Sequence, residues 1–160
     1  MQTNTSHKHQ VPEIETPFHC TTTVQMRYTD YDMHQHVNNN AYFTFFDLAK
    51  VDYFTKVSNN RFEIDHRSLV IANINVNFLS PAMLTESIQV LTQCVKVGDK
   101  SLTLVQQVCN SLTGEVKCMA TTVLVHFDPT TQQPITIPDH WRNAFNDFES
   151  RNLTPPNTHL

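Results

Sequence analysis

Glycine is nearly absent from this chain of 160 residues, which contains only 2 where average usage would give about 11. Glycine is the residue that most readily adopts the positive-φ conformations of tight turns. The turns of this chain must therefore rely largely on asparagine and aspartate, which tolerate such conformations better than most side chains.

The sequence also lacks an apolar run of membrane length and a recognisable secretory signal. Its 11 Lys and Arg are outnumbered by 15 Asp and Glu, which gives a net charge of −4 and argues against a general nucleic-acid binder. We expect a cytoplasmic protein without a membrane span. The length and the 39% of hydrophobic residues suit one domain that buries about two-thirds of its unfolded surface.

No C-x-x-C pair is present among the four cysteines. Cys20, Cys94, Cys109 and Cys118 each lie in a segment with the character of a strand. This spacing favours packed thiols over disulfides or a metal cluster.

The chain shows no internal repeat and no second domain. Residues 1–17 are polar without an apolar period, and we expect a flexible N-terminal segment there. Residues 18–150 would form the domain. Residues 151–160, with Pro155 and Pro156, would form a flexible C-terminal tail.

Apolar periodicity predicts a strand, a long helix and then four more strands. Phe18–Tyr28 alternates as a half-buried strand does, with Phe18, Cys20, Val24, Met26 and Tyr28 on one side. Asn40–Val57 has helical spacing and is apolar on nearly all faces, as buried helices are. The four later strands are predicted at Leu69–Leu79, Glu86–Val97, Ser101–Cys109 and Glu115–Phe127.

Short turns join these later strands, which favours an antiparallel sheet. Pro138 would open a last helix, in which Trp141, Ala144, Phe145 and Phe148 share one face. The predicted fold class is therefore α+β, with a five-stranded antiparallel sheet wrapped around one long central helix and a short C-terminal helix.

One stretch, Arg27–Phe54, combines polar and apolar features unlike the rest of the chain: RYTDYDMHQHVNNNAYFTFFDLAKVDYF. A loop with two aspartates and two histidines meets three asparagines, which are good helix-capping residues, where the helix begins. Asp32 lies seven residues before Asn39, so the loop can fold its carboxylate back over the free amides of the first helical turn. A carboxylate can act as nucleophile or general base, and helix N-terminal amides suit a developing oxyanion.

The pattern D-x-D-x-x-x-H-V-N-N, followed by a tyrosine and an aromatic-rich helix with an acid and a base, resembles the hot-dog-fold acyl-CoA thioesterases. The branch it resembles is the one typified by 4-hydroxybenzoyl-CoA thioesterase. The resemblance implies hydrolysis of acyl-CoA or another acyl thioester to the free acid, with no cofactor, because CoA is part of the substrate. It also implies a homodimer or homotetramer with the active site at a subunit boundary.

Carried over by position, the resemblance makes Asp32 the catalytic acid and Asn39 the residue whose amide polarises the carbonyl. Supporting roles fall to His36, Asn38, Tyr42 and Asp47, and substrate binding to Phe45, Phe46, Arg67 and Lys100. On the helix, Asp47 and Lys50 stand where the family more often has Glu and Arg. Gln35 replaces the family's usual glycine, so it either adopts an ordinary conformation or is strained by about 1–2 kcal/mol.

Plainer interpretations of the same residues stay open. Asp32 could simply cap a turn, Phe45 and Phe46 could be core residues, and Asp47 and Lys50 could form a local helix pair. A rival hypothesis is a metal-dependent hydrolase that uses His34 and His36 with the neighbouring aspartates. A third is a hot-dog protein that binds acyl groups or dimerises without catalysis, because a fold does not determine a function.

Overall fold

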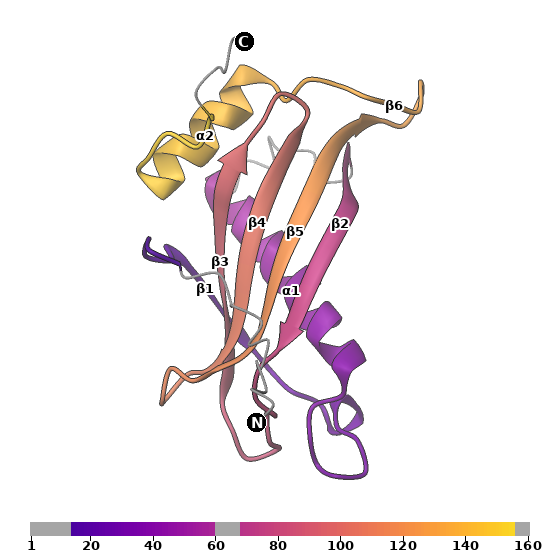
Figure 1. Ribbon diagram of the computed structural model, residues 1–160, viewed down its shortest axis with the longest axis vertical. Helices are drawn as coiled ribbons and strands as arrows, with labels where there is room; N and C mark the ends of the chain where they lie inside the picture. The colour runs from indigo at the N-terminus through magenta and orange to yellow at the C-terminus, as the bar shows by residue number, and fades with distance from the viewer. Residues whose placement is uncertain (1–13, 60–67, 156–160) are drawn as a thin grey trace, which may run out of the picture.

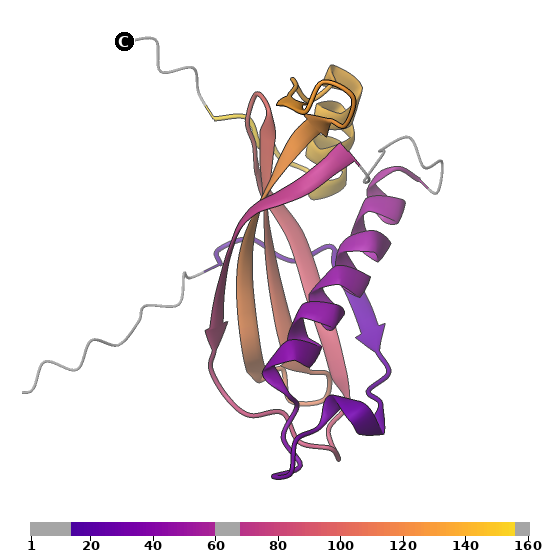
Figure 2. The ribbon, with the colours of Figure 1, turned by 90° about the vertical axis from the view of Figure 1, so that its right-hand side faces the viewer.

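A computed structural model describes residues 14–59 and 68–155 of the chain. Figure 1 shows one twisted sheet with helix α1 (Asn39–Val57) across one face and helix α2 (Asp139–Glu149) at one end. Figure 2 shows α1 running along the length of that face. Most of the N-terminal segment predicted to be flexible, and residues 156–160, lie outside the described residues.

The sheet is antiparallel throughout, in the order β1-β3-β4-β5-β2. Its strands are β1 (Cys20–Val24), β2 (Leu69–Phe78), β3 (Ile88–Val97), β4 (Ser101–Asn110) and β5 (Val116–Asp128). A two-residue strand, β6 (Gln133–Pro134), pairs with the end of β5 and was not predicted. The predicted α+β architecture, with five main strands and a long central helix, is confirmed.

The first strand ends earlier than its alternation predicts. After Val24 the chain leaves the sheet and forms a short 3-10 helix, η1 (Tyr28–Asp30), because the Asp30 carboxylate accepts hydrogen bonds from the backbone N–H and the guanidinium of Arg27. The inward orientation expected for Tyr28 is therefore wrong, since this side chain is 89% exposed. The turn at Asp30 overrides the strand pattern.

Helix α1 packs on the sheet with one side only. The residues of its buried side are Ala41, Tyr42, Phe45, Phe46, Ala49, Tyr53, Phe54 and Val57. On the opposite side Phe43, Leu48 and Val51 are exposed by 40 to 51%. The expectation of a helix buried on nearly all faces is wrong for the single chain, because the sheet covers one side of α1.

The core falls into two clusters along α1. The first joins the C-terminal half of α1 to α2, where Tyr53 and Phe145 are both fully buried. The second joins the N-terminal half, with Tyr42, Phe45 and Phe46, to the far ends of the strands. All four cysteines are free and buried, which confirms the prediction of packed thiols.

Residues 151–155, the described part of the expected tail, lie against β3. The Arg151 guanidinium donates to the Gln93 side chain and to the Cys94 carbonyl, both at 3.0 Å. Leu153 is 5% exposed and belongs to the first core cluster. No helix in the described part of the chain is long and apolar enough to cross a membrane.

Candidate active site

The loop between η1 and α1 holds the Asp32 carboxylate by its own backbone. The Oδ1 atom of Asp32 accepts hydrogen bonds from the backbone N–H groups of His34, at 2.8 Å, and His36, at 3.1 Å. The Asp32 N–H also donates to the His36 carbonyl at 2.8 Å. The plainer interpretation of a turn cap is thus correct for Oδ1, while Oδ2 makes no hydrogen bond within the described part of the chain.

These bonds also determine the charge of the carboxylate. Desolvation raises the pKa of Asp32, but the backbone N–H groups of His36 and His34 lower it, and the balance places the pKa below the usual aspartate value. Asp32 is therefore ionised at neutral pH. An ionised carboxylate with one unbonded oxygen can act as a nucleophile or a general base.

Gln35 lies in the middle of this loop and has a φ of 61°. The ordinary conformation left open by the sequence is thereby excluded, and the residue carries the strain of about 1–2 kcal/mol expected for a left-handed side-chain-bearing residue. Its N–H donates to the Asp32 carbonyl at 3.0 Å, which closes the turn. The backbone therefore adopts a conformation that glycine would allow without strain, although glutamine occupies the position.

The N-terminus of α1 leaves one backbone donor unused. The Asn38 side chain caps the helix by accepting from the Asn40 N–H at 2.9 Å, and the Ala41 N–H donates to the Asn38 carbonyl. The Asn39 N–H makes no hydrogen bond to another described residue, and Asn39 is exposed. An unpaired amide at the positive end of the helix dipole is suited to bind an oxyanion.

A cavity of about 310 Å³ brings these groups together. Its lining consists of Asp32, His36, Val37, Asn39, Tyr42, Phe78, Leu79, Ser80 and Pro81. Burial raises the pKa of Tyr42 to about 12, and its ring contacts Phe78 edge-on at a centroid distance of 5.6 Å. Of the predicted site residues, the cavity thus contains the two assigned to catalysis and two assigned supporting roles.

A second cavity of about 380 Å³ also borders this loop. It is lined by Tyr28, Tyr31, Asp32, Met33, Gln35 and Leu84. Asp32 is the residue common to both cavities.

The remaining predicted residues lie elsewhere, and their roles stay predictions. Phe45 and Phe46 are core residues, 3% and 2% exposed. Asp47 pairs with the Lys50 ammonium at 2.7 Å and is itself exposed, as the plainer interpretation of a helix pair expects. Lys100 lies in the turn between β3 and β4, at the opposite end of the sheet from the Asp32 loop (Figure 1). Arg67 lies outside the described residues.

The residues of the rival metal hypothesis do not form a ligand set. The rings of His34 and His36 are 6.3 Å apart between centroids, while the Asp30 carboxylate is engaged by Arg27 at 3.0 Å. Within residues 14–59 and 68–155, no group of three or more His, Cys, Asp or Glu side chains is arranged to hold a metal ion.

Sequence reasoning missed one wall of the site, residues 79–87, which join β2 to β3. The Val37 N–H donates to the Ala82 carbonyl at 2.9 Å, and His36 forms an isolated antiparallel bridge with Met83. From the sequence, Ser80-Pro81 indicated only the end of a strand. No periodicity signals such a contact, because its two partners lie far apart in the chain.

Comparisons with known proteins concern the family and the fold. Residues 26–145 match the family model described as the thioesterase-like superfamily. Long-chain acyl-CoA thioesterase FadM of Escherichia coli K12 is 28% identical over 117 residues, which are 72% of this chain and 89% of FadM.

Solved structures support the same fold. A thioesterase from Thermus thermophilus, complexed with coenzyme A and Zn, aligns with a TM-score of 0.73 and 26% identity, covering 84% of this chain and 97% of that one. The DHNA-CoA thioesterase of Staphylococcus aureus has a TM-score of 0.70 at 20% identity, over 82% and 91% of the two chains. At that identity the likeness concerns the fold alone. The hot-dog fold and the resemblance to its thioesterases are confirmed.

Proposed function

The chain belongs to the thioesterase-like superfamily, and from that premise we propose that it hydrolyses acyl-CoA thioesters to the free acid and CoA. One observation carries the proposal: the ionised Asp32 lines the same cavity as Asn39, whose backbone N–H has no hydrogen-bond partner among the described residues. FadM, a relative, is named as a long-chain acyl-CoA thioesterase, and the Thermus thermophilus thioesterase was crystallised with coenzyme A. Both names support CoA thioesters as the substrate class.

In the proposed mechanism, Asp32 attacks the thioester carbonyl carbon or removes a proton from the water that attacks it. The carbonyl oxygen becomes an oxyanion and accepts a hydrogen bond from the Asn39 N–H. Loss of one such donor typically costs about 3 kcal/mol of transition-state stabilisation. The carbon–sulfur bond then breaks, and in the general-base route the CoA thiolate takes up the proton that Asp32 removed from water. In the nucleophilic route the thiolate is protonated by solvent and the acyl group stays on Asp32 as an anhydride, which water then hydrolyses to the free acid and the free carboxylate. His36 supports the reaction by fixing the Asp32 carboxylate through its N–H.

The acyl group would lie against the apolar part of the cavity. Tyr42, Phe78 and Leu79 supply this surface beside Asp32. The proposed reaction uses no metal ion and no cofactor, and activity that survives exhaustive chelation would support this. Complete loss of activity on chelation, restored by a divalent ion, would instead favour a metal-dependent hydrolase.

We also propose that the protein is a homo-oligomer that pairs copies of the sheet at β2. This strand is one edge of the main sheet (Figure 1). Val70 and Ile71 on β2, with Leu48 and Val51 on the outer side of α1, are exposed by 41 to 51%. Unpaired apolar strand edges are normally covered in stable proteins. Light scattering should give a mass of at least twice the 18.4 kDa of one chain, and a fully active monomer would contradict a shared site.

The experiment that tests the function is a thiol-release assay over acyl-CoAs of varied length, including aromatic acyl groups and acyl-carrier-protein thioesters. We expect turnover on at least one CoA thioester. If none is hydrolysed while acyl-CoA still binds, the chain is a non-catalytic acyl-binding hot-dog protein. The cytoplasmic location expected from the sequence stays a prediction.

A further inference from the structure

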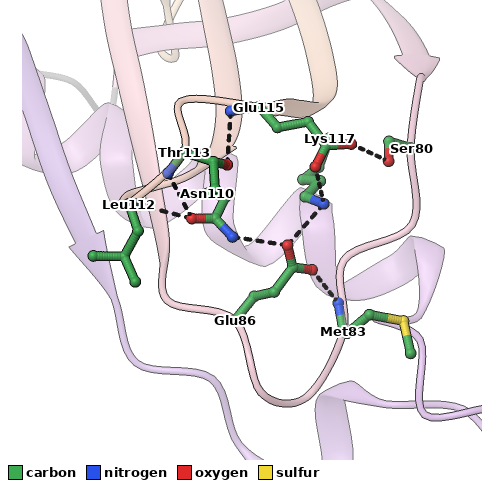
Figure 3. A network of polar contacts seen from close by, with 8 residues as sticks. All are labelled: Ser80, Met83, Glu86, Asn110, Leu112, Thr113, Glu115 and Lys117. Carbon is green, nitrogen blue, oxygen red and sulfur yellow. Dashed lines mark hydrogen bonds and ion pairs between the residues drawn. The ribbon is translucent and has the colours of Figure 1, made fainter.

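Strand β5 buries a lysine that the proposed reaction does not use. Lys117 is 4% exposed, and its Nζ donates to the Glu86 Oε1 atom and the Glu115 Oε2 atom, both at 2.8 Å (Figure 3). Lysine is seldom buried to this extent without paired charges. Desolvation lowers the pKa of Lys117, but its bonds to Glu115 and Glu86 raise it above the usual lysine value. The ammonium therefore stays charged.

Both ends of the 79–87 segment are attached to this lysine. At one end, the Leu79 and Ser80 N–H groups donate to the Lys117 carbonyl at 2.8 and 3.1 Å. The Ser80 hydroxyl also donates to Glu115 Oε1 at 2.6 Å. At the other end, Glu86 accepts the Lys117 ammonium.

Glu86 in turn shapes the segment. Its Oε2 atom accepts from the Met83 N–H at 2.7 Å, which closes the turn between Met83 and Glu86. Its Oε1 atom also accepts from the Asn110 side-chain amide at 2.8 Å, which ties this turn to the end of β4 (Figure 3). The carboxylate is thus held from three sides.

The 79–87 segment connects the Lys117 network to the Asp32 loop. Its Ala82 carbonyl accepts from the Val37 N–H, and its Met83 bridges His36, whose own N–H holds Asp32. Two contacts therefore separate the Lys117 network from the Asp32 carboxylate. Nothing else in the proposed mechanism explains a charged group buried at this place.

We propose that Lys117 is a positioning residue, which holds the 79–87 segment at both ends and thereby fixes the Asp32 loop against the N-terminus of α1. Without the ammonium, Glu86 and Glu115 would repel each other, and Glu86 would keep a poorly solvated charge without its partner. The segment would then move toward water and release Val37 and His36. The kinetic consequence rests on the proposed function, whereas the effect on the loop does not.

The test compares Lys117→Met with Lys96→Met, which removes the same charge from an exposed site on β3. In Lys117→Met we expect kcat to fall by roughly 10- to 100-fold, because small misplacements of reacting groups have effects of this size. KM should change less than kcat. Hydrogen–deuterium exchange should become faster in the peptide covering residues 30–38. Lys96→Met should match the wild type in kcat, in KM and in the exchange of residues 30–38.

Two milder substitutions keep the proposal testable if Lys117→Met does not fold. Glu86→Gln keeps the shape of the side chain and should show the same changes more weakly, so it decides the matter if Lys117→Met does not fold. Lys117→Arg, which can still donate to both carboxylates, should recover most of kcat.

Two results would overturn the proposal. One is a folded Lys117→Met or Glu86→Gln that is less heat-stable but keeps wild-type kcat and wild-type exchange in residues 30–38. The other is wild-type exchange there in the whole series. If the wild type hydrolyses no thioester, the proposed function fails, but exchange still decides whether Lys117 fixes the loop.

Discussion

The two ends of α1 differ in whether the polar groups around them are hydrogen-bonded to the protein. At the C-terminal end, the Tyr53 hydroxyl donates to Glu149 Oε1 at 2.6 Å, and the Cys94 N–H donates to both side chains. Tyr53 is fully buried there and stacks on Phe145 at a centroid distance of 6.2 Å. At the N-terminal end, one Asp32 oxygen and the Asn39 N–H have no hydrogen bonds to other described residues, and both residues line a cavity.

This difference shows how one helix can serve both stability and chemistry. An unpaired polar group costs about 1–3 kcal/mol when it is buried, which favours pairing at the closed end. One nearby exception among the described residues is the buried Gln93 Nε2, which has no hydrogen-bond partner. An unpaired group costs little when water reaches it, as at Asp32 and Asn39, both of which are exposed. The open end can therefore keep donors and acceptors free for a substrate, while the closed end holds the helix in place.

The largest expected effect is the difference in kcat between Asp32→Asn and its control, Asp128→Asn. Asp128 also caps its own turn, by accepting from the Thr130 N–H at 2.8 Å, but it lies away from the cavity. An asparagine oxygen can still accept these bonds, so both variants should fold. We expect kcat for acyl-CoA hydrolysis to fall about 10²- to 10⁴-fold in Asp32→Asn, the range for a lost general base, and not at all in Asp128→Asn. Equal activities would remove Asp32 from the mechanism.

Truncation of one phenylalanine at each end should affect stability more at the closed end and activity more at the open end. Phe145→Ala removes a fully buried ring and should lower the free energy of unfolding by about 3–5 kcal/mol. Phe78→Ala removes a ring that is 48% exposed and should cost roughly half as much or less. Because Phe78 lines the cavity, its loss should lower kcat/KM more than the loss of Phe145 does. Urea unfolding and assays below the unfolding range would measure both.

The pH profile gives a smaller effect at the open end. The pKa of Asp32 is lowered, so the carboxylate remains ionised as the pH falls past the usual aspartate value of about 3.9. Any stability from its hydrogen bonds is likewise present above that value and is lost only as the pH falls through the lower folded-state pKa. We expect the acid limb of kcat/KM to be flat from pH 7 to about pH 4. A fall centred near pH 6, in protein that circular dichroism shows to be folded, would point to another group.

The smallest expected effects concern two left-handed residues, one at each end. Gln35 has a φ of 61° in the Asp32 loop, and Ser150 has a φ of 54° at the C-cap of α2. Glycine at either position relieves strain but loses more entropy on folding, so we expect gains in unfolding free energy of no more than about 1 kcal/mol. Gln35→Gly should also keep kcat. A large loss of activity in that variant would show that the glutamine side chain itself acts.

Much of the fold was predictable because its signals are local. The strand alternations after residue 68 and the apolar spacing of α1 placed these elements close to their observed bounds. Asn38 was predictable as a helix cap from residue type alone. The early end of β1 was not, because the bond between Arg27 and Asp30 competes with an alternation that is otherwise regular.

The candidate site was predictable only in part. Asp32 and Asn39 are near each other in sequence, so the loop that joins them could be inferred, and the structure places both on one cavity. Leu79, Ser80 and Pro81 reach this cavity, and Lys117 contacts their segment, only after β2, β3 and β5 have paired. The signals of these residues in the sequence indicate a turn and a strand. Phe43, Leu48 and Val51 looked like core residues until the sheet was seen to cover one side of α1.

By itself, the sequence determined the strands after residue 68 other than β6, where α1 begins and which carboxylate stands before it, because each depends on neighbours within a few residues. Only the tertiary structure decided which polar groups are paired and which face water. That distinction depends on packing between distant segments. It buries Lys117 between two carboxylates, and it puts Asp32 on the same cavity as Asn39, whose N–H has no partner among the described residues.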